Sequence, residues 1–218
     1  MDASLETRFL QSYKEYRESA EYRGRRQQTK FCAVARSIIN AALRSDLTNE
    51  ALTAFIHLFK PRDMSDKLVK YLVQIGVGKE EQLTIQRLYS ESGVAGYTAV
   101  GKSAIQGLDL SQLKAVNTLL ESARDAQSVE DVLRAVSKYE RQGVPQVKMG
   151  IYSPWLYYLQ PEMCPIVNGA IKSALRLFGW DQTYMHAVKL FQRLKQLTHE
   201  TDLGMIDFYF PNYRYRNN

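Results

Sequence analysis

The sequence predicts an all-α protein of irregular layout, with about eight to ten short helices, and three observations carry this prediction. Apolar residues recur three and four positions apart along most of the chain, which is the spacing of one helix face. Ser, Thr, Asp or Asn precedes several of these runs, where its side chain can cap a first turn. No segment before residue 205 alternates as a half-buried strand would, so at most a minor β element is expected near the C-terminus.

The first quarter of the chain predicts three helices and one basic loop. We expect the first helix over residues 5–23 and interpret Gly24 as the residue that breaks it. The next two helices should cover residues 31–43 and 50–59, and the second of them should stop before Pro61.

Short helices and glycine turns alternate in the middle of the chain. The helices expected here cover residues 65–73, 80–89, 109–123 and 128–139. Residues 75–79 form a glycine turn between the first two of these helices. Residues 92–103 are the loosest stretch of the chain and predict a loop or a flexible edge.

The part of the chain most rich in proline and aromatic residues, residues 150–168, should form a rigid elbow between two buried helices. We call residues 153–168 the proline elbow. Ser153 is the expected N-cap of a short apolar helix that has Pro154 in its first turn. Asn168 should cap the next helix, which Gly179 ends.

A long helix over residues 183–197 comes next, capped by Thr183 or Asp181. Residues 205–210 are then a brief strand or a final helical turn, and residues 211–218 are a tail or a linker. We expect one domain over residues 1–210, and a division into lobes at 1–107 and 108–210 stays open.

The composition places the chain among ordinary soluble proteins. Its 218 residues carry a net charge of +6, which favours a polyanion over an acidic partner. Cys32 and Cys164 form no CxxC pair, and the three histidines have no metal-ligand spacing. We therefore expect no metal and no cofactor, a reduced cytoplasmic setting and no membrane segment.

A cluster of cations beside an aromatic residue is the first candidate site for nucleic acid. The cations can neutralise phosphates, and the aromatic ring can stack on a base. The residues are Tyr22, Arg23, Arg25, Arg26 and Lys30. The alternative is a solvated loop between helices, and the pattern favours neither interpretation.

Two glycine-rich segments give weaker phosphate candidates. Gly76, Gly78 and Lys79 are similar to a helix-hairpin-helix turn, although a plain turn has the same pattern. Residues 96–103 match GxxxxGKS letter by letter, which makes Lys102 a candidate. A P-loop also needs a buried strand before it and a helix after it, and neither is predicted, so we do not expect nucleotide hydrolysis.

Further candidates are spread over the second half of the chain. Tyr152 and Trp155 could line a pocket for an extruded base, although core packing is the stronger interpretation of Trp155. The remaining cations proposed to meet phosphates are Lys172, Arg176, Arg214 and Arg216. No catalytic residue is assigned. If the chain were an enzyme of glycosylase type, Asp109 would be the candidate carboxylate.

The proline elbow and two segments C-terminal to it resemble a known family. The sequence SPWLYYLQPEMCPIVN at residues 153–168, ALRLFG at 174–179 and MIDFYF at 205–210 are similar to a helical segment of McrB-type modification-dependent restriction proteins. The resemblance covers about residues 145–210. It departs from the pattern at Met163 and Cys164, where an aromatic residue is usual, and at Gly169. It implies a DNA-recognition region that works with an AAA+ motor and a nuclease subunit.

We therefore expect a module that binds double-stranded DNA, with the reading of a modified base as one option. Two alternatives stay open: a protein-interaction scaffold of a larger enzyme, and, less favoured, a helix-hairpin-helix enzyme of glycosylase type. The first alternative predicts an exposed apolar patch, and the second requires a carboxylate or a lysine in a cleft.

Overall fold

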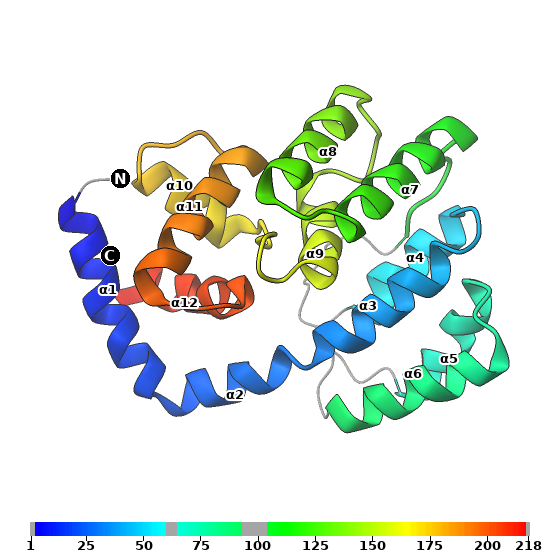
Figure 1. Cartoon of the computed structure of the whole chain (residues 1–218), viewed down its shortest axis with the longest axis horizontal. Coiled ribbons are helices and arrows are strands. Elements are labelled where there is room, and N and C mark those ends of the chain that lie inside the picture. Colours follow the sequence, from blue (N-terminus) through cyan, green and yellow to red (C-terminus); the bar gives the residue numbers. More distant parts are fainter. Residues whose placement is uncertain (1–2, 60–64, 93–103, 217–218) are drawn as a thin grey trace.

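The computed structural model describes residues 3–59, 65–92 and 104–216, and their secondary structure consists of twelve helices with no strand. The all-α prediction is confirmed, and the segment 205–210 is helical. The helices are α1 (Ala3–Glu18), α2 (Ala20–Gln28), α3 (Phe31–Ala42), α4 (Asn49–Leu58), α5 (Ser65–Gln74), α6 (Lys79–Ser92), α7 (Leu110–Arg124), α8 (Val129–Arg141), α9 (Met149–Leu159), α10 (Gly169–Leu177), α11 (Tyr184–Thr198) and α12 (Leu203–Arg216) (Figure 1).

Helices from the two ends of the chain pack together. α12 lies against α1, α2, α10 and α11, and α1 also contacts α11 (Figure 1). We call these five helices the terminal lobe. Its contacts join residues from both sides of the possible lobe boundary between 107 and 108.

The remaining helices are organised around α3 and α9. α3 packs against α6 and α9, α7 packs against α8 and α9, and α4 and α5 form a further pair. Every residue of α9 from Ile151 to Leu159 is buried. Residues 153–159 of the proline elbow thus lie in the core, as their apolar composition indicates, whereas Glu162 at its corner is exposed.

Asn168 and Thr183 form the caps expected of them, and Ser128 and Asp109 cap two further helices. The side chains of Ser128, Asn168 and Thr183 each accept a hydrogen bond from a backbone N–H in the first turn of their helix. Asp109 forms a full capping box with Gln112. These short-range signals set the starts of α7, α8, α10 and α11.

The start of α9 was predicted wrongly. The helix begins at Met149, so Pro154 lies inside it and Ser153 is not its N-cap. Proline cannot donate a hydrogen bond to the carbonyl of Gly150, which costs the helix one bond. Ser153 is fully buried instead, and its hydroxyl accepts a hydrogen bond of 2.9 Å from the backbone N–H of Val167. This bond joins the two arms of the elbow.

Replacing Ser153 with alanine should lower the free energy of unfolding by about 1–2 kcal/mol, because the buried N–H of Val167 would lose its partner. Chemical denaturation followed by circular dichroism measures this change. Ser137→Ala on the exposed face of α8 is the matched control. Equal stability of the two variants would contradict this role for the Ser153 hydroxyl.

α2 is the second departure from the prediction. Gly24 does not break a helix but lies in the middle of α2. The break falls at Ser19, whose hydroxyl donates to the carbonyl of Tyr16 and accepts from the N–H of Tyr22. At the other end of the chain, residues 211–216, for which a tail or linker was expected, continue α12.

Candidate nucleic-acid interface

Residues 22–45, which cover most of α2 and all of α3, are rich in basic residues, and we call this segment the α2–α3 ridge. The two helices follow each other in the chain: α2 lies at the lower edge of the view, and α3 continues from it to pack against α9 and α6 (Figure 1). Lys30, between them, has helical dihedral angles (φ −60°, ψ −26°), so the backbone passes from one helix towards the other without an extended segment. The ridge contains no Asp or Glu, and its basic residues are Arg23, Arg25, Arg26, Lys30, Arg36 and Arg44.

The apolar side of the ridge fixes which residues face solvent. Phe31 and Ile38 are fully buried, and they anchor α3 in the core. Arg23, Arg26 and Lys30 are exposed. Their spacing of three and four residues places them on one side of the helical path. The structure therefore brings three of the predicted phosphate ligands together on one solvent-facing side.

Arg25 is partly exposed and contacts both Glu21 and Phe208. Its Nε lies 3.8 Å from a carboxylate oxygen of Glu21, and its guanidinium lies 5.0 Å from the ring centre of Phe208. A cation over an aromatic face is stabilised by the ring quadrupole. Because Phe208 belongs to α12, Arg25 links the ridge to the terminal lobe. At the far end of the ridge, Arg44 pairs with Glu81 of α6.

Tyr22 does not offer a ring to a base. The residue is only 6% exposed, and its hydroxyl donates a hydrogen bond of 2.7 Å to Glu200. Arg17 lies 3.5 Å from the same carboxylate oxygen. The expected stacking role of Tyr22 is wrong, because the ring faces the interior of the terminal lobe.

The expected base pocket at Tyr152 and Trp155 is wrong for the same reason. Each residue is only 1% exposed. The hydroxyl of Tyr152 donates to Glu140, and the ring of Trp155 packs edge-on against Phe55. Burial raises the pKa of Tyr152 above its ordinary value. Both side chains are part of the core, which is the stronger of the two interpretations given for Trp155.

The glycine turn connects α5 and α6, as predicted. Gly76 has a φ of 77°, and its N–H and that of Val77 bond back to carbonyls of α5, which closes that helix. Lys79 starts α6, and Glu80 and Glu81 are the next residues in its first turn. These two carboxylates lie beside the amides that would meet a phosphate, so they oppose binding there; the role of Gly76, Gly78 and Lys79 stays a prediction.

The other predicted cations have different settings. Lys172 and Arg176 lie one turn apart on α10, where Lys172 is half-buried and Arg176 is exposed. Lys102 and the rest of the GKS segment lie outside the described residues. Arg214 and Arg216 belong to the last turns of α12, and their side chains also lie outside the described part.

The terminal lobe keeps carboxylates inside, which the sequence did not reveal. Residues 163–218 contain seven basic and four acidic residues. Glu200 and Asp207 are only 8% and 5% exposed, and Asp202 is half-buried. Asp181 alone of the four is exposed. The surface of this segment is therefore more positive than its sequence composition implies.

Asp207 is the least exposed of these four acids. One of its oxygens accepts a hydrogen bond of 2.9 Å from the side-chain amide of Asn168, the N-cap of α10. Burial raises the pKa of Asp207 to about 7, although Asn168 and Arg25 both act to lower it. A single Asp inside the apolar run MIDFYF is the only signal that could have indicated this position.

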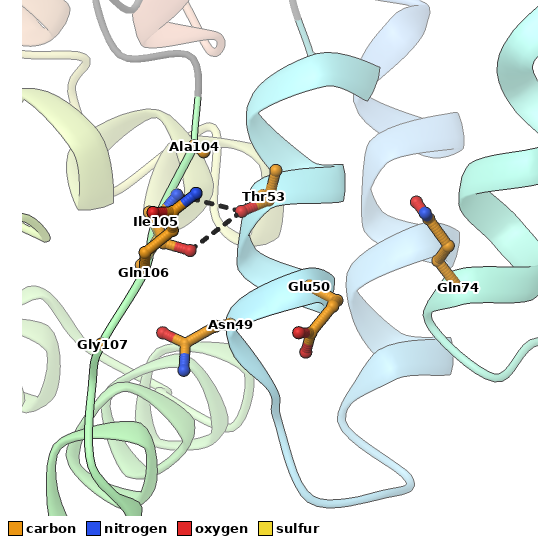
Figure 2. Close-up of a pocket in the computed structure, with 8 residues that line it drawn as sticks. All are labelled: Asn49, Glu50, Thr53, Gln74, Ala104, Ile105, Gln106 and Gly107. Atoms are coloured by element: carbon orange, nitrogen blue, oxygen red, sulfur yellow. Dashed lines mark hydrogen bonds between the residues drawn. The ribbon is translucent and has the colours of Figure 1, made fainter.

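A polar cavity of about 320 Å³ lies between α4, α5 and residues 104–107 (Figure 2). Thr53 Oγ donates to the carbonyl of Ile105 and accepts from its N–H, at 3.2 and 2.9 Å. Asn49 pairs in the same way with Leu108. The hydrogen bonds of Thr53 and Asn49 hold residues 105–108 against α4. The polar groups of these two side chains therefore already have partners within the protein.

The residues considered as catalytic candidates have structural roles or are buried. The carboxylate of Asp109 caps α7, and His57 stacks on Tyr71. Cys164 is fully buried, and burial raises the pKa of its thiol to about 12. No group of metal ligands occurs among residues 3–59, 65–92 and 104–216. Within the same ranges, no helix has both the length and the apolar character that a bilayer span requires.

Comparisons with protein-family models, curated proteins and solved structures found no match to this chain. The resemblance of residues 145–210 to McrB-type proteins therefore stays a prediction.

Proposed function

We propose that the protein is a DNA-binding module that uses the α2–α3 ridge to hold the phosphate backbone. The observation that carries the proposal is the ridge itself, which has six basic residues, no acidic residue and three exposed cations on one side. Such an arrangement neutralises phosphates and releases their counterions, which gives an affinity that falls with salt.

The contrast with the rest of the described chain supports this proposal. Residues 104–162 contain six basic and seven acidic residues. Several arginines outside the ridge lie beside carboxylates, as in the pairs Arg87–Glu91, Arg124–Asp125 and Arg134–Asp131. Positive charge is thus enriched in residues 22–45 and 163–218, as polyanion binding requires, whereas α1 and the start of α2 carry the exposed acids Glu15, Glu18 and Glu21.

Replacing Arg23, Arg26 and Lys30 together with glutamine should weaken the binding of a short fluorescent duplex at least about tenfold in low salt, as measured by anisotropy. The matched control replaces Arg134, Lys138 and Arg141 with glutamine. These three residues are exposed on α8, so the control loses the same net charge from another helix. Equal weakening in both variants would contradict a site on the ridge.

The resemblance of the elbow to McrB-type proteins extends this proposal to a biological role. A DNA-binding module of a restriction-type defence system would hold DNA for an AAA+ motor or a nuclease subunit on another domain or chain. Co-purification of this chain with such a subunit, retained after nuclease treatment, tests that role. Failure of a purified motor subunit to bind would remove the role but not the DNA site.

A protein-interaction scaffold is the second candidate. Val69 and Val73 on α5 are 42% and 59% exposed, and Leu83 on α6 is 61% exposed. Exposed apolar side chains on neighbouring helices are typical of protein contacts. This candidate requires a partner that resists nuclease treatment and is lost in the Val73→Ser, Leu83→Ser double variant.

A further inference from the structure

We infer that the α2–α3 ridge binds the sugar–phosphate backbone of duplex DNA without reading base identity or cytosine methylation. This inference rests on the proposed function and narrows it: the ligand is a run of consecutive phosphates. Selection of a modified base, which the family resemblance implies, is then not a property of this surface.

The spacing of the exposed cations is the first argument. Arg23 and Lys30 are seven residues apart, with five of these steps inside α2 and the last two in the turn before α3, and a rise of 1.5 Å per residue over all seven gives about 10 Å. Phosphates of one strand advance by about 3.4 Å each along the duplex axis, so the same length spans about three phosphate steps. The three cations Arg23, Arg26 and Lys30 can thus each meet a phosphate within a run of about four.

The position of the aromatic rings is the second argument. Reading an extruded base requires rings that stack on it and polar groups that meet its edge. Tyr22 faces inward and donates to Glu200, and Tyr152 is buried and donates to Glu140. Trp155 packs on Phe55 in the core. The three rings predicted to stack on bases are therefore buried and do not lie among the exposed cations.

The fixed setting of α2 is the third argument. Tyr22 and Arg25 attach α2 to the terminal lobe through Glu200 and Phe208. These two contacts lie on either side of Gly24 and oppose rotation of the helix about its axis. A ridge held in one orientation presents its cations as a preformed row, which suits the regular backbone of a duplex.

The test compares duplexes that differ only in what the ridge is inferred to ignore. The probes are one short fluorescent duplex, the same duplex with 5-methylcytosine on both strands, a shuffled duplex of equal composition and the single strand. We expect the three duplex affinities to agree within about twofold and to exceed that of the single strand. Three phosphate contacts give a slope of about −2.7 for log K against log salt.

Single variants then assign the contacts. Arg23→Gln, Arg26→Gln and Lys30→Gln should each reduce the magnitude of the salt slope by about 0.9. Arg23→Lys and Arg26→Lys retain the charge and should retain the slope, which separates a phosphate contact from a loss of folding. Thermal melting of each variant confirms that the fold is intact.

The outcomes separate the inference from the proposed function. A preference of about tenfold or more for the methylated duplex, or for one sequence, would overturn the inference and leave DNA binding in place. Tighter binding of the single strand, or glutamine variants with an unchanged slope, would also overturn it. Absence of salt-dependent binding to any probe would instead remove the proposed function.

Discussion

Replacing Gly204 with alanine is expected to lower the free energy of unfolding by about 3 kcal/mol, because the new methyl group has no space. A Cβ on Gly204 would lie 2.7 Å from Cζ of Tyr157 and closer still to its hydroxyl oxygen. Tyr157 is fully buried, and its hydroxyl donates to Asp202 at 2.8 Å, while Cys32 lies 3.4 Å away. The ring cannot yield without breaking that bond, so α12 must shift.

Urea denaturation followed by circular dichroism measures this effect. Gly24→Ala is the control, since Gly24 has open space around its Cβ position and lies inside α2. Alanine there should raise stability by about 0.5–1 kcal/mol, because glycine is the poorer helix former. The Gly204→Ala, Tyr157→Phe double variant should recover part of the loss, as Cζ stays in place. A Gly204→Ala protein as stable as the unmodified one would show that α12 adapts.

The sequence was sufficient for the parts of the fold that short-range chemistry sets. Caps at Ser128, Asn168 and Thr183 and the glycine stop at Gly179 lie where the pattern places them. Each depends on a hydrogen bond or a dihedral angle within a few residues. Such signals do not depend on what the rest of the chain does.

Long-range packing decided the points that were predicted wrongly. Gly24 stays helical because Tyr22 and Arg25 are fixed by Glu200 and Phe208, which lie more than a hundred residues away. Pro154 stays inside α9 because its neighbours are all buried. No local pattern contains these contacts, so a glycine or a proline was interpreted as a break.

In the candidate site, too, the features set by local sequence could be predicted, and those set by long-range packing could not. The basic cluster at residues 23–30 could be predicted, because charged side chains are exposed unless they are paired. The role of Tyr22, Tyr152 and Trp155 could not, because an aromatic residue serves the core and a binding surface equally well. The burial of Glu200 and Asp207 could not be predicted either, because it depends on how α12 packs against the other helices.

The stability that Asp207 contributes should depend strongly on pH. An ordinary aspartate titrates near pH 4, whereas burial raises the pKa of Asp207 in the folded protein to about 7. Unfolding between about pH 4 and pH 7 therefore releases a proton, and the stability that Asp207 contributes below pH 4 is lost as the pH rises through 7. Three pKa steps correspond to about 4 kcal/mol.

The Asp207→Asn variant should lose this dependence, because asparagine does not ionise and its carbonyl can still accept from Asn168. The stability of the variant minus that of the unmodified protein should then rise by about 4 kcal/mol between about pH 4 and pH 7. Only this change with pH is decisive, since any fixed cost of the substitution cancels. Urea denaturation at several pH values measures it.

Asn168→Ala provides the opposite test. The amide of Asn168 favours the ionised form of Asp207, so its loss should raise the pKa of Asp207 further and extend the fall of stability to higher pH. The lost cap on α10 adds a cost that does not vary with pH.

Parallel stability curves for Asp207→Asn and the unmodified protein would contradict the raised pKa of Asp207. They would show that Asp207 ionises inside the fold as easily as in the unfolded chain, with water or Arg25 compensating its charge.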